Sequence, residues 1–453
     1  MLTATDNRIG IAGTLLAAIV FGEVVALGVD GPFLATIAAA VELVGGLLIL
    51  GLLWPRPVFW RRFALPLGLG ILAWAWIASP GWFAADPFGR RWSAPDLLPQ
   101  ASGRFLGGLA LMTAAAAIGW RRGGVRLTVD RWLLFGLVNI AVALAFRHYN
   151  PDAVWGIDKG DLRDRFTGTF LNANSAACYF AVLAVLAAGR GFSLALDRGM
   201  SSSLVIHIVA PIALLGGIGA CAITGSRTAL LVMLIALALL VWQFGRLWLR
   251  RQRGAVRGLI VGVGVVGILL MVFAILGDAT LDRVGEIQAD WVERTELWDL
   301  YSRLAAAAPL GYGPGGLDDA ALHGFASIHE AHIAWFVHST HNIVLSLLIT
   351  GGYPYLAIMS LLVVALLFPY FRRAHRLREP VVVALVAALA VIFVCASTDV
   401  ALDMPALASA AAVLAGLVWG RASRFVAEAA GGQAGMRLLT NGSAGVLATS
   451  PSA

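Results

Sequence analysis

Runs of apolar residues, separated by short polar stretches, repeat along the whole chain. A helix that crosses a bilayer needs roughly 20 mostly apolar residues, because the hydrocarbon core is about 30 Å thick and the helix rises about 1.5 Å per residue. Runs close to this length lie at 9–29, 33–54, 63–79, 103–120, 132–147, 170–189, 204–224, 227–245, 255–277, 341–368, 380–397 and 404–420. The pattern therefore predicts an all-α polytopic membrane protein with about twelve transmembrane helices.

The composition supports this fold class. Of the 453 residues, 59% are hydrophobic and 13% are charged, and the mean hydropathy is +0.83. Soluble domains have about 45–50% apolar and about 25% charged residues. The composition therefore excludes an ordinary soluble globular protein.

Basic residues are concentrated in every second loop, which predicts the orientation of the chain. Cytoplasmic loops of membrane proteins carry an excess of Lys and Arg. With a cytoplasmic N-terminus, the cytoplasmic side holds about two thirds of the 33 Lys and Arg residues. These residues lie in both termini and in loops 55–62, 121–131, 190–203, 246–257 and 369–379. We therefore expect both termini inside, and the net charge of +7 indicates topology rather than a nucleic-acid partner.

One connection is much longer than the others and divides the chain. Residues 1–277 hold nine expected spans, 278–340 form a large loop on the outer side, 341–420 hold three further spans, and 421–453 form a flexible cytoplasmic tail. Loops of this length in a compact chain are usually functional or disordered. This one has helical spacing of apolar residues at Trp291, Leu297, Trp298, Tyr301 and Leu304. We expect a short amphipathic helix, a turn at GYGPGG, and a second short helix before His338.

Five of the eight histidines lie in this loop or at its end, and three interpretations of them remain open. They are His323, His329, His332, His338 and His341. Imidazole is a common zinc ligand, but the spacing matches no compact zinc pattern and none of the three cysteines lies near. The histidines are otherwise scattered interfacial residues, or one of them transfers a proton. No metal or other cofactor is expected.

Arginines gather on the same predicted face as the large loop. Arg227 begins a span, Arg294 lies in the large loop, and Arg163 and Arg165 precede a span that contains Asn172 and Asn174. Singly, each arginine is explained by contact with lipid headgroups or by pairing with a nearby Asp. Together they favour an anionic ligand, because arginine binds phosphate bidentately and keeps its charge at any working pH. A diphosphate headgroup fits this chemistry.

Four segments, in this order and on this topology, resemble the bacterial O-antigen ligase and O-antigen polymerase superfamily. They are RFTGTFLNANSAACYFA, TGSRTALLVMLIAL, ERTELWDLYSRLAAAAPLGYGPGG and HNIVLSLLITGG, and they span roughly residues 160–370. The resemblance implies a GT-C-like inverting glycosyltransferase of the bacterial inner membrane. Such an enzyme takes a glycan from an undecaprenyl-diphosphate carrier at the periplasmic face, without a metal or a nucleotide sugar. Its acceptor is the lipid A core of lipopolysaccharide or a growing polysaccharide.

Roles for individual residues follow from the matched motifs. Arg227 and Arg294 would hold the diphosphate, and His341 of the His-Asn pair would act on the acceptor hydroxyl. Arg165 corresponds to the basic position before the GTF segment. The sequence departs from the family in one turn, because TGGYPYL stands where members often have a glycine-proline-glycine type of turn.

The polar neighbours of these residues are expected to contact the substrate. They are Asn172, Asn174, Asn342 and His338, and we expect His338 to lie one helical turn from His341. The chemistry agrees with the roles, because arginines oppose the charge that grows on a leaving diphosphate and a neutral histidine accepts a hydroxyl proton.

Three classes of function remain open from the sequence: a glycan transferase, a transporter or lipid flippase, and a membrane scaffold. Ligase and polymerase use the same donor and differ in the acceptor. A secondary transporter or lipid flippase also has about twelve spans, but it would show more charged residues near the membrane midplane, where Glu23 and Glu42 are the main candidates. A membrane scaffold would give no reason for arginines and histidines to gather on one face.

Overall fold

The structure is a computed structural model that describes residues 4–29, 31–82, 86–90, 92–160, 163, 165–196, 204–250, 284–372 and 379–446. Within these residues the chain is almost entirely helical, and the only paired strands are β1 (Ala153–Val154) and β2 (Ile157–Asp158). The all-α membrane fold predicted from the apolar pattern is confirmed.

Eleven helices in the described part of the chain are long and apolar enough to cross a membrane. The expected ninth span, 255–277, lies outside the described residues. The spans are formed by α1 (Ala4–Val25), α2 (Pro32–Leu53), α3 (Pro57–Ala78) with η1 (Ser79–Gly81), η2 (Pro95–Leu97) with α4 (Leu98–Gly119), α5 (Gly124–Tyr149), α6 (Ala173–Leu196), α7 (Leu204–Ile223), α8 (Arg227–Leu240) with the π-helical turn η4 (Val241–Gly245) and α9 (Arg246–Leu249), α15 (Ile343–Phe371), α16 (Pro380–Thr398) and α17 (Pro405–Val446).

Helix α6 and the span Pro405–Glu428 of α17 lie at the centre of the bundle, since 72% and 78% of their apolar windows are buried. Helix α4 packs against α2 and α17, and α6 packs against α7 and α16. Close approach of α17 to α4 depends on Gly416 and Gly420, since a Cβ on either would meet the backbone of α4. This small-xxx-small spacing is typical of helix contacts in membranes, where packing replaces the hydrophobic effect.

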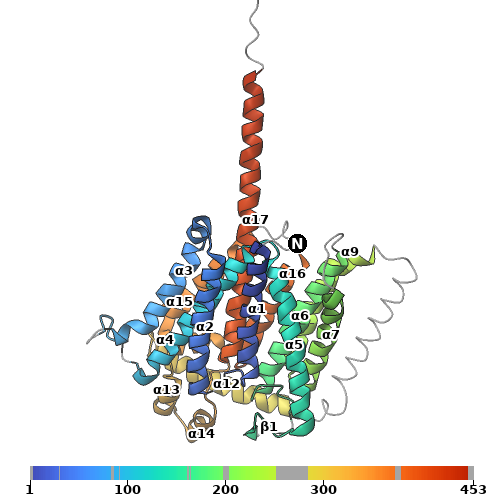
Figure 1. Cartoon of the computed structure of the whole chain (residues 1–453). Helices are drawn as coiled ribbons and strands as arrows, with labels where there is room; N and C mark the ends of the chain where they lie inside the picture. The colour runs from blue at the N-terminus through green and yellow to red at the C-terminus, as the bar shows by residue number, and fades with distance from the viewer. Residues whose placement is uncertain are drawn as a thin grey trace, which may run out of the picture.

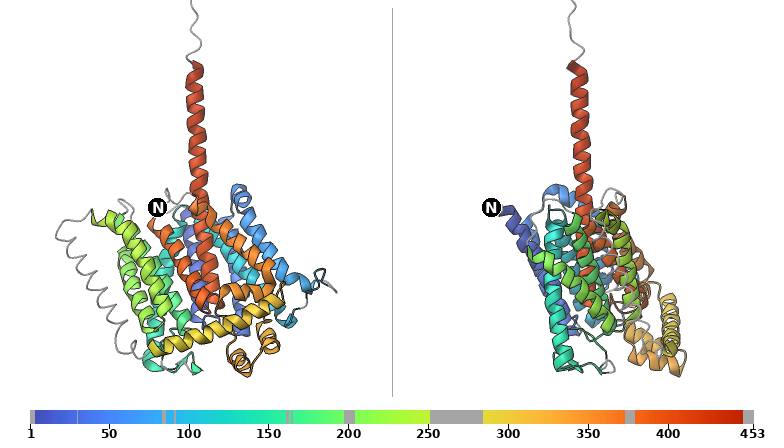
Figure 2. Two further views of the ribbon diagram at one scale, coloured as in Figure 1. Left: turned by 180° about the vertical axis from the view of Figure 1, so that it is seen from behind. Right: turned by 90° about the vertical axis from the view of Figure 1, so that its right-hand side faces the viewer.

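The large loop covers one end of the bundle. Its helices α12 (Val284–Ala307), α13 (Leu317–Gly324) and α14 (Ile328–Phe336) lie at the end opposite the start of α1 (Figure 1). Helix α12 runs across this end beneath the spans (Figure 2). The start of α1 and the extension of α17 share the other end, as expected for two termini on one side of the membrane.

Two features of the loop region differ from the expectation. Where one second short helix was expected, the structure has two, α13 and α14. The new helix α14 starts after Ser327, whose hydroxyl accepts a hydrogen bond from the Glu330 N–H, as an N-cap does. The first expected short helix is α12, which has 24 residues, and Leu297, Tyr301 and Leu304 are buried in it as their spacing predicts. At the other end of the molecule, α17 continues to Val446, so the structure has a helix where a flexible tail was expected from residue 421.

Helix α15 is bent at Gly352, and the turn after α12 fills the bend. Gly352 has φ 69° and ψ −168°, and Pro354 has no N–H to continue the helical ladder. The carbonyls of Ile349 and Thr350 instead accept hydrogen bonds from the N–H groups of Tyr312 and Gly313, at 2.7 and 3.1 Å. The Tyr353 N–H donates to the carbonyl of Pro309 at 2.9 Å. The TGGYPYL departure therefore still produces a close backbone approach, between residues 309–313 and α15.

The last turn of α3 and the connection from α3 to α4 hold this bend from the other side. Trp76 Nε1 donates to the Gly351 carbonyl at 2.8 Å, and the Ser93 N–H donates to the Tyr312 carbonyl at 2.8 Å. Arg90 is buried in this connection, where it pairs with Asp86 at 2.7 Å and lies 4.2 Å from the centre of the Trp76 ring. The hydrogen bonds from Arg90 lower the pKa of the Asp86 carboxyl. These contacts fix the N-terminal half of α15, which follows directly from His341.

Candidate functional site

Polar residues from four distant segments meet at the end of the bundle that carries the large loop. Arg165 comes from the segment before α6 and Asn174 from its first turn, Arg294 from α12, His341 from the residues before α15, and Asp399 from the end of α16. Three of the four segments were singled out from the sequence. The fourth, with Asp399, was not.

Asp399 is the centre of this cluster. Its side chain is 9% exposed, and its Oδ2 accepts hydrogen bonds from Asn174 Nδ2 at 2.6 Å and from a terminal nitrogen of Arg294 at 3.2 Å. The other terminal nitrogen of Arg294 donates to the Thr398 carbonyl at 2.7 Å. Carbonyls in the last turn of a helix lack intrahelical partners, so the C-terminal end of α16 is suited to receive a guanidinium.

Arg165 joins the cluster through Asn174. It donates to Asn174 Oδ1 at 3.3 Å and to the Thr224 carbonyl at 3.2 and 3.3 Å. The Asn174 amide thus links a guanidinium on one side to the Asp399 carboxylate on the other. Two arginines therefore lie around one carboxylate.

His341 faces the same carboxylate. Its Nδ1 is 3.7 Å from Asp399 Oδ1, and its side chain is 24% exposed, so the ring is partly accessible from outside the bundle. The backbone of His341 is left-handed, with φ 49°. Such a conformation is uncommon for a residue with a side chain and costs roughly 1–2 kcal/mol. It persists only where the surrounding contacts hold it.

His338 lies apart from His341. The residues between them are not helical, since α15 begins only at Ile343, so the expected spacing of one helical turn is wrong. The Nδ1 atom of His338 instead lies 3.1 Å from Asp318 Oδ1 on α13. The physical reason is the Asn342 side chain, which caps α15 and stops the helix from extending back to His338.

Two of the expected substrate-binding asparagines bind the chain itself. Asn172 Oδ1 accepts the N–H groups of Asn174 and Ser175, and Asn342 Oδ1 accepts those of Val344 and Leu345. Asn342 also donates to the Ser397 carbonyl at 3.2 Å. The two side chains therefore fix the start of α6, which carries Asn174, and the start of α15, which follows His341.

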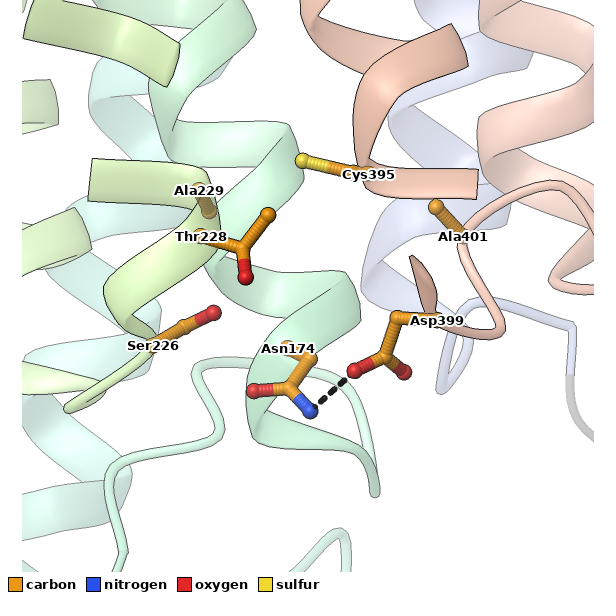
Figure 3. A pocket seen from close by; sticks show the side chains of 7 residues that line it. All are labelled: Asn174, Ser226, Thr228, Ala229, Cys395, Asp399 and Ala401. Atoms are coloured by element: carbon orange, nitrogen blue, oxygen red, sulfur yellow. Dashed lines mark hydrogen bonds between the residues drawn. The ribbon is translucent and has the colours of Figure 1, made fainter. Parts of the chain in front are cut away.

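Arg227 lies beside the cluster, at the first position of α8. It is exposed, and its neighbours Ser226 and Thr228 line a pocket together with Asn174, Asp399, Cys395, Ala229 and Ala401 (Figure 3). The cavity itself is small, about 10 Å³, which is room for about one water molecule. Figure 3 shows the hydroxyls of Ser226 and Thr228 on one wall and the bonded pair of Asn174 and Asp399 on another. The pocket connects the helix that begins with Arg227 to the acidic centre of the cluster.

Two further histidines of the loop and Arg163 have partners elsewhere, while the side chain of His323 lies outside the described residues. His329 lies 2.8 Å from Glu296, and the His332 ring contacts Phe336 edge-on. Arg163 pairs with Asp158 in the β1–β2 region, which lowers the pKa of Asp158 to about 2. Among the described residues, no three His, Cys, Asp or Glu side chains are placed to hold a metal ion together.

Comparison with protein families gives one finding. Residues 212–360 match the family described as O-antigen ligase. A search of curated proteins finds no match to the chain. The matched residues run from within α7 to within α15 and include Arg227, Arg294 and His341, whereas Arg165, Asn174 and Asp399 lie outside them. The match confirms the resemblance to the O-antigen ligase and polymerase superfamily.

Proposed function

We propose, from the match of residues 212–360 to the O-antigen ligase family, that the chain transfers a glycan from an undecaprenyl-diphosphate carrier to an acceptor hydroxyl. The acceptor class we favour is that of a ligase, the lipid A core of lipopolysaccharide. The proposed reaction is a single displacement that inverts the anomeric centre. It uses no metal and takes place at the periplasmic face of the inner membrane.

The observation that supports this proposal most directly is the arginine-rich cluster around Asp399. In the reaction, the bond between the anomeric carbon and the diphosphate breaks, and the diphosphate leaves with the electron pair. Arg165 and Arg294 are positioned by hydrogen bonds to Asn174, Thr224, Thr398 and Asp399, so little reorganisation is needed when this charge develops. A preorganised donor of this kind is worth about 3 kcal/mol of transition-state stabilisation.

Arg227 would extend the same cluster across the pocket. It is exposed at the N-terminal end of α8, where the helix dipole adds a partial positive charge. A diphosphate bound beside Thr228 and Ser226 would therefore meet a guanidinium and a helix terminus together. A bidentate guanidinium has the planar geometry that phosphate oxygens accept.

His341 would remove the proton from the acceptor hydroxyl as its oxygen attacks the anomeric carbon. A general base contributes on the order of 10²–10⁴ in rate. Asp399 lies on the Nδ1 side of the ring, where a carboxylate favours the tautomer that leaves the second ring nitrogen free to accept a proton. The separation of 3.7 Å is longer than a hydrogen bond, and such contacts commonly shorten when substrate binds.

The position of the cluster suits a donor with a lipid tail. The cluster lies at the ends of membrane spans, and α15 begins two residues after His341. A polyprenyl chain would remain in the bilayer beside the helices, while the diphosphate and the sugar reach the polar end. This arrangement explains why titratable side chains directly precede a long apolar helix.

A reconstituted transfer assay tests the proposal. Purified protein in lipid nanodiscs is mixed with an undecaprenyl-diphosphate glycan and a lipid A core acceptor, and the product is followed by its gel shift. Transfer is expected with wild-type protein, and Arg227→Lys should lose most of it because lysine keeps the charge but not the planar fork. Failure of the wild-type protein to consume the donor with any hydroxyl acceptor would refute the proposal.

Ligase and polymerase are distinguished in cells by the product that accumulates. Deletion of the gene followed by glycan analysis should leave complete chains on the carrier if the protein is a ligase. Single repeat units would show that it is a polymerase.

A further inference from the structure

The connection between α16 and α17 contains a second acidic residue, Asp403, that no role above uses. Asp403 Oδ2 accepts a hydrogen bond from Ser339 Oγ at 2.5 Å, and its Oδ1 accepts one from Ser346 Oγ at 3.1 Å. Ser339 is two residues before His341, whereas Ser346 is in the first turns of α15. One carboxylate therefore bonds the chain on both sides of His341.

Ser339 carries this contact to the backbone of His341. Its Oγ donates to Asp403 and at the same time accepts the N–H of His341 at 3.2 Å. A serine that accepts the N–H of the second residue ahead closes a small side-chain turn. This turn includes the left-handed backbone at His341, with φ 49°. The orientation of the imidazole therefore depends on a hydroxyl that Asp403 holds in place.

The geometry of the connection ties Asp403 to Asp399. The N–H groups of Asp403 and Met404 both donate to the Val400 carbonyl, at 3.0 and 3.2 Å, and the Val400 N–H donates to Asp399 Oδ1 at 2.8 Å. This turn sets the distance between the two carboxylates. One of them faces the His341 ring, and the other holds the His341 backbone through Ser339.

We propose that Asp403 is a positioning residue, which acts through Ser339 to hold His341 in the left-handed conformation that turns its ring toward Asp399. The inference rests on the proposed function in so far as His341 is the base of that reaction. The contact itself is a property of the chain and is measurable without any substrate.

The variants compare the two serines that share the Asp403 carboxylate. Ser339→Ala and Asp403→Ala break the contact to His341. Ser346→Ala removes the other hydrogen bond to the same carboxylate and leaves the Ser339 contact in place, so it is the matched control. Ser339→Thr keeps a hydroxyl at the same position and serves as the conservative rescue.

The first measurement is the modification of His341 by diethyl pyrocarbonate, with His338 as an internal standard on the same peptide. The His338 side chain is 66% exposed and that of His341 is 24% exposed, so the two are distinguishable in the wild-type protein. The ratio of His341 to His338 modification, read by mass spectrometry, should rise several-fold in Ser339→Ala and Asp403→Ala. It should stay at the wild-type value in Ser346→Ala and Ser339→Thr.

The second measurement is turnover in the reconstituted assay. Misplacement of a catalytic group by about 1 Å costs on the order of 10²-fold, so Ser339→Ala and Asp403→Ala should lower kcat tenfold or more with little change in KM for the donor. The double variant should lose no more than either single variant, because both changes break one contact.

Two results would overturn the inference. One is a modification ratio that stays at the wild-type value in both Ser339→Ala and Asp403→Ala. The other is an equal effect of Ser346→Ala, which would make Asp403 a general cap of α15. A raised ratio with unchanged turnover supports the positioning contact and refutes His341 as the base, so the two proposals fail separately.

Discussion

The bend of α15 gives the sharpest stability prediction, for Gly352→Ala. The φ and ψ of Gly352, 69° and −168°, lie in a region that is essentially restricted to glycine, and another residue there costs about 1–3 kcal/mol. A Cβ at this position would also lie 2.5 Å from the backbone of Leu310 and would meet the Pro309 carbonyl oxygen. Overpacking of this kind typically costs a further 1–3 kcal/mol. The free energy of unfolding should therefore fall by about 3 kcal/mol or more.

The assay is thermal unfolding in detergent, followed by tryptophan fluorescence. At about 2 °C per kcal/mol for a large chain, the apparent Tm should fall by roughly 5 °C or more. Gly68→Ala in α3 is the control, because a Cβ there meets no atom within 4 Å and the backbone is helical. Its Tm should stay close to that of the wild type. If both variants melt within a degree of each other, the packing of residues 309–313 into α15 does not stabilise the fold.

Four further predictions concern the cluster and its surroundings. Arg294→Lys should lose most transfer activity while the protein still inserts in the membrane, and full activity would favour a contact with lipid headgroups instead. His341→Ala should lower turnover by roughly 10²-fold with donor binding kept, and treatment with a chelator should have no effect; activity that zinc restores would identify a metal site. Because the pKa of Asp86 is lowered by Arg90, its contribution to stability is present above the unfolded value of about 3.9 and is lost as pH falls through the folded value. Asp86→Asn should therefore lower the Tm at pH 7, by a difference that shrinks below pH 4. A cysteine at Asp318, in a cysteine-free background, should react with an impermeant label in intact spheroplasts, and labelling only after the inner membrane is opened would reverse the topology.

The membrane spans were predictable because their signal is local. A run of apolar residues long enough to cross the bilayer identifies itself without reference to the rest of the chain. The cationic half of the cluster was predictable for a related reason, since arginines next to membrane spans are expensive and therefore conspicuous. This is why Arg165 was found from the sequence, whereas Arg294, in the large loop, was found from the matched motif, and the structure places both in one cluster.

The acidic half of the cluster was missed because its signal depends on three-dimensional contacts. Asp399 and Asp403 lie in STDVALDMP, which has the composition of any short connection between spans. The sequence offered one signal for the acidic half, namely an acidic residue at the end of a span on the predicted face.

The start of the helix after His341 could also have been predicted, because Asn342 directly before an apolar run is an N-cap signal. The fitting of residues 309–313 into α15 had no local signal, since the partners are about forty residues apart.

The assembly of the cluster from four segments has a consequence for exchanging parts between related proteins. The matched domain, residues 212–360, supplies Arg294 and His341 but neither Asp399 nor Asn174. A chimera that takes only this domain from a relative would combine the relative's arginines and histidine with Asn174 and Asp399 of this chain. The hydrogen-bond geometry of these two residues suits the arginine and histidine that the chimera lacks. Grafts that carry residues 165–174 and 397–404 together with the domain should keep activity where the domain alone does not. The unit that can be exchanged between relatives is therefore the set of contacts around one carboxylate, and it is discontinuous in the gene.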